Sequence, residues 1–193
     1  MKPNPISNPF SKAEILRDLE AVREWSLDFW RQFETSEFFA PVGEAWSPAD
    51  NVRHLVKSNR PVAMAMGLPR IVLYLRFGLA RRPSRSYSEM YATYQDALGG
   101  GLKAGRYEAS PVSPEQRTAE GRERALQSLA GTFEALAVEL RRWPEKALDR
   151  ARLPHPGLGP LTVREMLLFT LYHNAHHVMG VARRNPVSAG AVM

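Results

Sequence analysis

Apolar residues recur at alternating spacings of three and four along three long stretches of the chain, the pattern of an amphipathic helix. The clearest of these stretches ends at Pro144, a residue that cannot continue a helix. The pattern therefore predicts three long helices, each with one face turned toward a shared core. The inward stripes are Ile15, Leu19, Val22, Ser26, Phe29 and Phe33, then Leu126, Leu129, Phe133, Leu136, Leu140 and Trp143, and finally Val163, Met166, Thr170, His173, His177 and Val181.

Five capping boxes indicate where helices begin. In such a box a Ser or Thr and an acidic residue or Gln three positions later each accept a hydrogen bond from the other's backbone N–H group. The pairs are Ser11–Glu14, Ser47–Asp50, Ser86–Glu89, Ser113–Gln116 and Thr162–Glu165. We expect a helix from Pro48 to about Arg60, just before Pro61, and we expect the Ser113 box to open the helix that ends at Pro144.

The sequence predicts an all-α fold, a bundle of four long helices, because no stretch alternates apolar and polar residues over the length of a strand. Residues 61–112 are expected to form a helical insert between the second and third bundle helices, with a short helix over 87–98. So long a connection permits an up-down-down-up order without requiring it. We expect one domain over residues 11–184, with 1–10 and 185–193 as flexible tails.

The composition is that of a globular protein and excludes several kinds of site. The 193 residues are 44% hydrophobic and 24% charged, and they include no cysteine, which rules out disulfides, thiolate zinc sites and a cysteine nucleophile. The net charge of +6 would favour acidic partners, but the basic residues form no stripe, so nucleic-acid binding is disfavoured. The most apolar stretch, 61–80, is interrupted by Pro69, Arg70 and Arg76, and residues 1–10 lack the pattern of a signal peptide. We therefore expect a cytoplasmic protein that does not span a membrane.

Three of the five histidines lie within five residues near the C-terminus. His173 and His177 are four apart, so both project from the inward face of one helix and could bind one divalent cation. His176 lies to the side of this pair and is a poorer ligand. A hydrogen-bonded polar cluster in the core is the alternative interpretation. Asn174 occupies the position where the helix of a zinc peptidase carries its general-base Glu, which disfavours that class of enzyme.

A tight metal site needs a third ligand, and His54 is the candidate on another helix. The spacing alone does not favour it, because His54 shares a helix side with Asp50 and Lys57 and lies away from the apolar stripe. A solvated histidine fits that position at least as well. His155, in the segment HPGLG, is expected to be an ordinary loop residue.

Two motifs together resemble the DinB-like (DinB/YfiT-type) superfamily of bacterial proteins. They are WSPADNVRHL at 46–55 and, about 120 residues later, HNAHH at 173–177. The resemblance extends from about Ser11 to Arg184. It implies an up-down-down-up four-helix bundle with a divalent metal at one end, held by His54, His173 and His177. Where relatives often carry Gln after the second motif, this chain has Gly180, which leaves the three ligands intact and bears on the choice of substrate.

The resemblance also implies a range of functions. Superfamily members with assigned roles include thiol-dependent S-transferases, a maleylpyruvate isomerase and metal-dependent hydrolases, and homodimers are common. For this chain it implies a divalent metal ion, and imidazole ligands would accept zinc, nickel, iron or manganese. We expect the substrate to be a small electrophile. The nucleophile would be water or a low-molecular-weight thiol cosubstrate, since the chain has no cysteine of its own.

The sequence gives weaker evidence for functional residues other than the three metal ligands. It also leaves other functions open. His176, Tyr172 and Asp50 are candidates for proton transfer or for supporting the ligands, and Arg53 and Arg164 could hold an anionic substrate. A non-enzymatic metal-binding bundle is the alternative to an enzyme. A nucleic-acid-associated protein is a third and weaker hypothesis.

Overall fold

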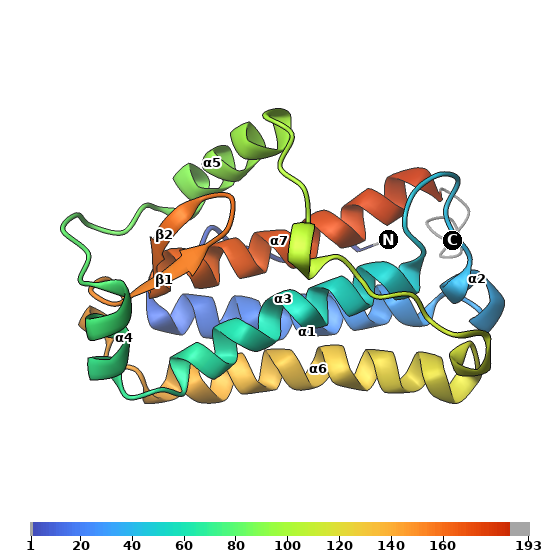
Figure 1. Ribbon diagram of the computed structural model, residues 1–193, viewed down its shortest axis with the longest axis horizontal. Helices are drawn as coiled ribbons and strands as arrows, with labels where there is room; N and C mark the ends of the chain where they lie inside the picture. The colour runs from blue at the N-terminus through green and yellow to red at the C-terminus, as the bar shows by residue number, and fades with distance from the viewer. Residues whose placement is uncertain (1, 186–193) are drawn as a thin grey trace.

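Four long helices form the body of the protein. The computed structural model describes residues 2–185. The bundle helices are α1 (Lys12–Arg31), α3 (Pro48–Met66), α6 (Ala119–Arg142) and α7 (Val163–Arg184). In Figure 1, α1 and α7 run in one direction and α3 and α6 run in the other, so the order along the chain is up-down-down-up. Helices α1 and α3 each pack against both α6 and α7. The predicted fold class is confirmed.

The shorter elements lie in the connections. Helix α2 (Thr35–Phe39) precedes α3, and α4 (Arg70–Phe77), α5 (Tyr87–Gly99) and the 3-10 turns η1 (Gly105–Tyr107) and η2 (Pro114–Gln116) lie between α3 and α6. The turn η3 (Glu145–Ala147) and an antiparallel hairpin of β1 (Arg152–His155) and β2 (Gly159–Thr162) connect α6 to α7. Figure 1 shows α5 and the hairpin on the same side of the bundle, where both contact α7.

Helix α3 is longer than predicted because it continues through Pro61 to Met66. Val62, Ala63 and Met66 prolong its buried face, and the Met66 carbonyl accepts a hydrogen bond of 2.9 Å from the indole N–H of Trp143. These tertiary contacts outweigh the cost of a proline inside a helix.

Helix α6 begins later than predicted. The Ser113 capping box forms, but it closes only the single turn η2, after which Arg117 leaves the helical conformation. Thr118 then caps α6 by accepting a hydrogen bond from the N–H of Gly121. A Cβ atom at Gly121 would lie 2.0 Å from the Gln116 carbonyl oxygen, so this sharp corner requires glycine. The insert between α3 and α6 therefore spans 67–118 rather than 61–112.

The hairpin is a further difference from the prediction. Each strand has four residues, too few to show a clear alternation, and Pro154 pairs with Pro160 across the hairpin. Leu153 and Leu161 are directly paired and both are buried, so the hairpin is held by the core rather than by strand propensity.

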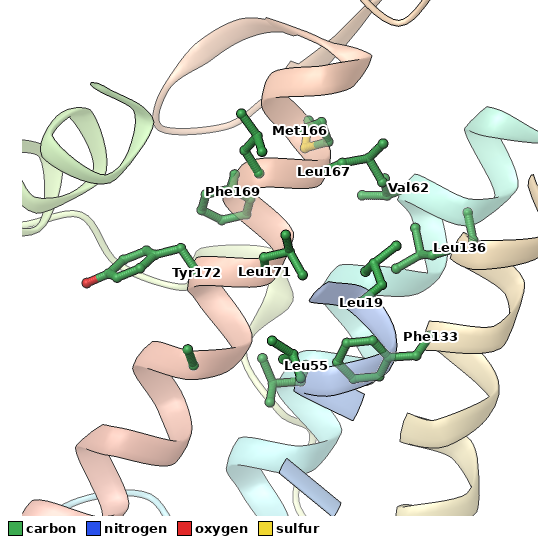
Figure 2. Packing of buried hydrophobic residues seen from close by; sticks show 14 of the residues in the cluster. Leu19, Leu55, Val62, Phe133, Leu136, Met166, Leu167, Phe169, Leu171 and Tyr172 are labelled. Atoms are coloured by element: carbon green, nitrogen blue, oxygen red, sulfur yellow. The ribbon is translucent and has the colours of Figure 1, made fainter. Parts of the chain in front are cut away.

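The core runs the length of the bundle. Figure 2 shows Leu19, Leu55 and Phe133 converging from α1, α3 and α6, and all three are fully buried. Each such side chain contributes about 1.5–3 kcal/mol relative to an exposed one. Residues 2–10, expected as a tail, lie against α1, where Asp18 accepts hydrogen bonds from Ser7. Most of the other expected tail, 185–193, lies outside the described residues. Among residues 2–185 no helix is both long enough and apolar enough to cross a membrane.

Candidate metal centre

Three histidines from two helices converge between α3 and α7. Nε2 of His173 lies 3.0 Å from Nε2 of His54 and 3.1 Å from Nε2 of His177. His54 and His173 are buried, and His177 is half-buried. The local sequence explains this placement. The Ser47 capping box fixes the start of α3 two turns before His54, and the four-residue spacing puts His173 and His177 on one face of α7.

The hydrogen bonds of two of these rings fix their protonation. Nδ1 of His54 lies 2.8 Å from the carbonyl oxygen of Tyr107, which can only accept, so Nδ1 carries the proton. Nδ1 of His177 lies 2.7 Å from the side-chain oxygen of Asn51. That amide is oriented by its NH₂ group, which donates to the carbonyls of Ser47 and Trp46. Both neutral rings therefore turn the lone pair of Nε2 toward His173.

His173 completes the cluster without a conventional partner of its own. Its Nδ1 is buried and makes no hydrogen bond with any described residue. Burial, and then the neighbouring imidazoles, hold the pKa of His173 well below its usual value, and burial likewise lowers the pKa of His177 and His54. Three neutral imidazoles thus meet through nitrogens that cannot all donate to one another.

The donor set fits a divalent metal ion. Zinc binds imidazole nitrogen at about 2.0–2.1 Å, so two ligands on one ion lie roughly 3 Å apart. Nε2 of His173 lies at such a distance from Nε2 of both His54 and His177, and all three ligand atoms lie within 4.8 Å of one another. A cation would accept all three lone pairs, which no single shared proton can do. The Nδ1–H groups of His54 and His177 already donate to Tyr107 and Asn51, the arrangement that orients metal-binding histidines in proteins.

Comparisons with known families and solved structures identify the family and support the fold. Residues 34–179 match the DinB superfamily. The chain belongs to that superfamily. Among solved structures, the chain is similar to YfiT from Bacillus subtilis, described as a probable metal-dependent hydrolase with an unusual four-helix bundle topology. That match has a TM-score of 0.60 and 15% identity, and it covers 98% of this chain and 94% of YfiT.

A second solved structure is TT2238, described as a four-helix bundle protein. It matches with a TM-score of 0.54 and 20% identity over 90% of this chain and 99% of its own. At such identities these likenesses establish the fold alone. No protein of curated function matches the sequence.

In this DinB protein the His54 side chain is buried. The solvated histidine that helical spacing allowed at this position is therefore wrong. The insert supplies the cover, because η1 brings the Tyr107 carbonyl against the His54 ring. The ring of Trp46 lies 5.2 Å from that of His54 and stacks on His177 at 6.3 Å. A contact 53 residues away in the sequence cannot be read from the periodicity of one helix.

The candidates for proton transfer lie outside the convergent group. The Asp50 carboxylate accepts from the Ser47 hydroxyl at 2.6 Å and serves the helix cap. The Tyr172 hydroxyl is bound by Gln95 and points away from the core, as Figure 2 shows. Burial raises the pKa of Tyr172 above its usual value. His176 is half-buried, with its ring 5.8 Å from that of Tyr94.

The two arginines considered for anion binding lie elsewhere as well. Arg164 is buried, and its guanidinium pairs with Asp149 at 2.6 Å and Glu145 at 2.8 Å. Arg53 lines a different cavity, beside α2 and α6. Neither reaches the three histidines. Asn51 is the supporting residue that the sequence interpretation overlooked, although it lies three residues before His54 and so on the same side of the helix.

A cavity of about 490 Å³ opens beside the three histidines. Its walls come from α3, α5, α7, the segment 102–108 and the tip of the hairpin. His155, expected to be an ordinary loop residue, ends β1 and lines this cavity. Sequence reasoning missed it because its role depends on the unpredicted hairpin.

Proposed function

We propose that this DinB protein binds one divalent metal ion through His54, His173 and His177 and acts on a small electrophilic substrate in the adjoining cavity. The convergence of three neutral imidazoles at Nε2 separations of 3.0 and 3.1 Å carries the proposal. The ion would be zinc, nickel, iron or manganese, all of which imidazole binds. When bound, such an ion supplies a positive centre that lowers the pKa of a water or thiol ligand.

The chain itself orients the imidazole ligands and keeps water away from them. Asn51 and the Tyr107 carbonyl hold protons on the outer nitrogens of His177 and His54 and so keep their inner lone pairs free. Trp46 and Phe169 pack against the imidazole rings and limit the access of water. Uncharged ligands leave the full positive charge of the ion available to a substrate.

Hydrolysis and transfer to a thiol are the two reactions that we propose for this centre. The description of YfiT as a probable metal-dependent hydrolase supports the first. A thiol would have to come from a cosubstrate, because the chain contains no cysteine. Turnover of an ester panel without thiol, or of an alkylating electrophile only with thiol, separates the two reactions.

Metal analysis of purified protein tests the proposal directly. We expect close to one equivalent of metal in the wild type and less than about a tenth of that in His54→Ala, His173→Ala and His177→Ala, since each removes one of three bonds. His176→Ala is the matched control, because it removes a neighbouring imidazole outside the group. Circular dichroism checks that the variants are folded. Full metal retention in all three triad variants would overturn the site.

The proposal extends to the state of the protein in the cell. The superfamily resemblance supports a homodimer, and a cytoplasmic location fits the lack of a membrane-crossing helix among residues 2–185. Light scattering at micromolar concentration tests the dimer, and fractionation of cells that produce the protein tests the location.

A further inference from the structure

The cavity beside the histidine cluster is mainly apolar. Away from the histidines most of its lining side chains are aliphatic, aromatic or proline, and Ser58 adds a hydroxyl. Two charged residues line it, Lys103 and Glu108, and both are exposed and opposite in sign, so neither gives the interior a net charge. A volume of about 490 Å³ lies within the range of small-molecule sites. The main apolar lining residues are Val62, Leu98, Leu102, Pro154, Met166 and Phe169.

One side chain in this wall has a fixed hydrogen-bond donor. Nδ1 of His155 accepts hydrogen bonds from the backbone N–H groups of Gly157 at 3.2 Å and Leu158 at 3.0 Å. Amide N–H groups only donate, so Nδ1 carries no proton and the neutral ring bears its hydrogen on Nε2. Burial lowers the pKa of His155 to about 4, so the ring is neutral at pH 7.

The Nε2–H group of His155 is free to serve a bound molecule. Within residues 2–185 nothing accepts a hydrogen bond from it, whereas both backbone contacts are made by Nδ1 on the opposite side of the ring. The ring meets Phe169 edge-on at 4.5 Å, and Phe169 stacks on His173 at 5.0 Å. A single phenyl ring therefore separates this donor from the histidine cluster.

We propose that the cavity binds an uncharged, mainly apolar organic molecule and that Nε2–H of His155 donates a hydrogen bond to an oxygen atom on it. This proposal rests on the function proposed above in taking the cavity as the substrate site. It adds the substrate class and a specificity-determining residue. An apolar wall favours burial of hydrocarbon and makes burial of a carboxylate charge costly. A donor with no acceptor in the protein favours a molecule that carries an oxygen acceptor, so a carbonyl-type oxygen fits best.

Two isosteric probes test the proposal, acetophenone and α-methylstyrene, which differ by C=O against C=CH₂. Binding is followed by NMR of methionine methyl groups in metal-free protein with chelator present. Met166 lines the cavity, whereas Met179 lies outside it and serves as the internal control. We expect both probes to shift the Met166 signal and to leave Met179 unmoved.

Substitutions at His155 then isolate the hydrogen bond. His155→Asn keeps an acceptor near the position of Nδ1 for the hairpin turn and removes the distant donor, whereas His155→Gln keeps a donor near the position of Nε2. Relative to the wild type, the preference for the ketone should fall about 3- to 10-fold in His155→Asn and change by less than about 2-fold in His155→Gln.

Three results would overturn the inference. They are an unmoved Met166 signal with folded protein, an unchanged preference in His155→Asn, and an equal loss in both variants, which would trace the effect to the hairpin turn. Because the probes are tested without metal, a failure here is distinct from a failure of metal binding, which elemental analysis of the same preparations decides.

Discussion

The side-chain oxygen of Asn51 on α3 lies 2.7 Å from Nδ1 of His177 on α7. The amide group of Asn51 is itself held by the carbonyls of Ser47 and Trp46 at the start of α3. The same turn that caps this helix thereby orients a candidate ligand on another helix. Local capping and the geometry of the site are coupled through one uncharged side chain.

Replacing Asn51 by Leu should weaken zinc binding by about 10- to 100-fold, as loss of such supporting hydrogen bonds does in other metal sites. The variant keeps the size of the side chain but removes the acceptor that holds His177. Competition with a coloured chelator measures the affinity. Asn51→Asp should retain binding, because a carboxylate accepts the same proton.

Asp50→Asn is the matched control for this experiment, since the Asp50 carboxylate accepts hydrogen bonds from Ser47, and the change leaves the Asn51 side chain that holds His177 in place. We expect it to lower the unfolding temperature without changing zinc affinity. Equal zinc affinity in Asn51→Leu and the wild type would show that Asn51 does not orient the ligand.

The His173 side chain should be dispensable for stability when metal is removed. His173→Phe removes a buried Nδ1 that has no partner among the described residues. It also removes the Nε2 contacts with His54 and His177, so a favourable and an unfavourable effect oppose each other. We expect the free energy of unfolding in chelator to change by less than about 1 kcal/mol, because the two effects are of similar size. Zinc at 100 times its dissociation constant should stabilise the wild type by about 2.7 kcal/mol and this variant not at all.

His177→Phe provides the contrast, because it leaves the side-chain oxygen of Asn51 unpaired in a buried place. That variant should lose about 1–3 kcal/mol of stability in chelator. Urea titrations of both variants, with and without zinc, measure the difference. If the His173→Phe protein without metal were much less stable than the wild type, His173 would have a structural role and this prediction would be wrong.

Local signals were sufficient to predict most helix starts. All five capping boxes form, and those at Ser11, Ser47, Ser86 and Thr162 each open an α-helix at the next residue. A capping box involves four consecutive residues, so it depends little on the rest of the fold. The Ser113 box differs because Gly121 allows a sharp corner directly after it.

The site could be predicted only in part, for a physical reason. The four-residue spacing of His173 and His177 places them together on any helix, but the burial of His54 depends on η1, which lies far along the chain. The family motif, rather than the periodicity, singled out His54. His155 and the hairpin depend on packing against α7, and four-residue strands carry no clear pattern of their own.

Glu165 should make the stability of the protein depend on acid pH. Burial alone would raise the pKa of this carboxyl, but hydrogen bonds from Arg82, Arg85 and the backbone N–H groups of Arg85 and Thr162 lower it to about 2, from an ordinary value of 4.5. The unfolded state therefore binds a proton more readily than the folded state. The stabilisation is present above about pH 4.5 and is lost as the pH falls toward 2.

Glu165→Gln tests this dependence. We expect it to lower the free energy of unfolding at pH 7 by on the order of 3 kcal/mol and to flatten its decline between pH 5 and pH 2 by about that amount. Glu14→Gln is the comparison, because it alters a similar capping box whose carboxylate is solvated. Parallel pH profiles for Glu165→Gln and the wild type would rule out this source of acid sensitivity.

Pro61 should be a site at which the protein can be stabilised. It is exposed inside α3, where it can donate no backbone hydrogen bond and its ring crowds the carbonyl four residues earlier. Pro61→Ala restores the donor and should raise the free energy of unfolding by about 1–3 kcal/mol, less the added freedom of the unfolded chain. Pro69→Ala, at the N-cap of α4, has no helical hydrogen bond to restore and should gain nothing comparable. Urea unfolding measures both variants. A less stable Pro61→Ala protein would mean that the bundle is built around a bend at this residue, and that the path of α3 between His54 and Met66 depends on it.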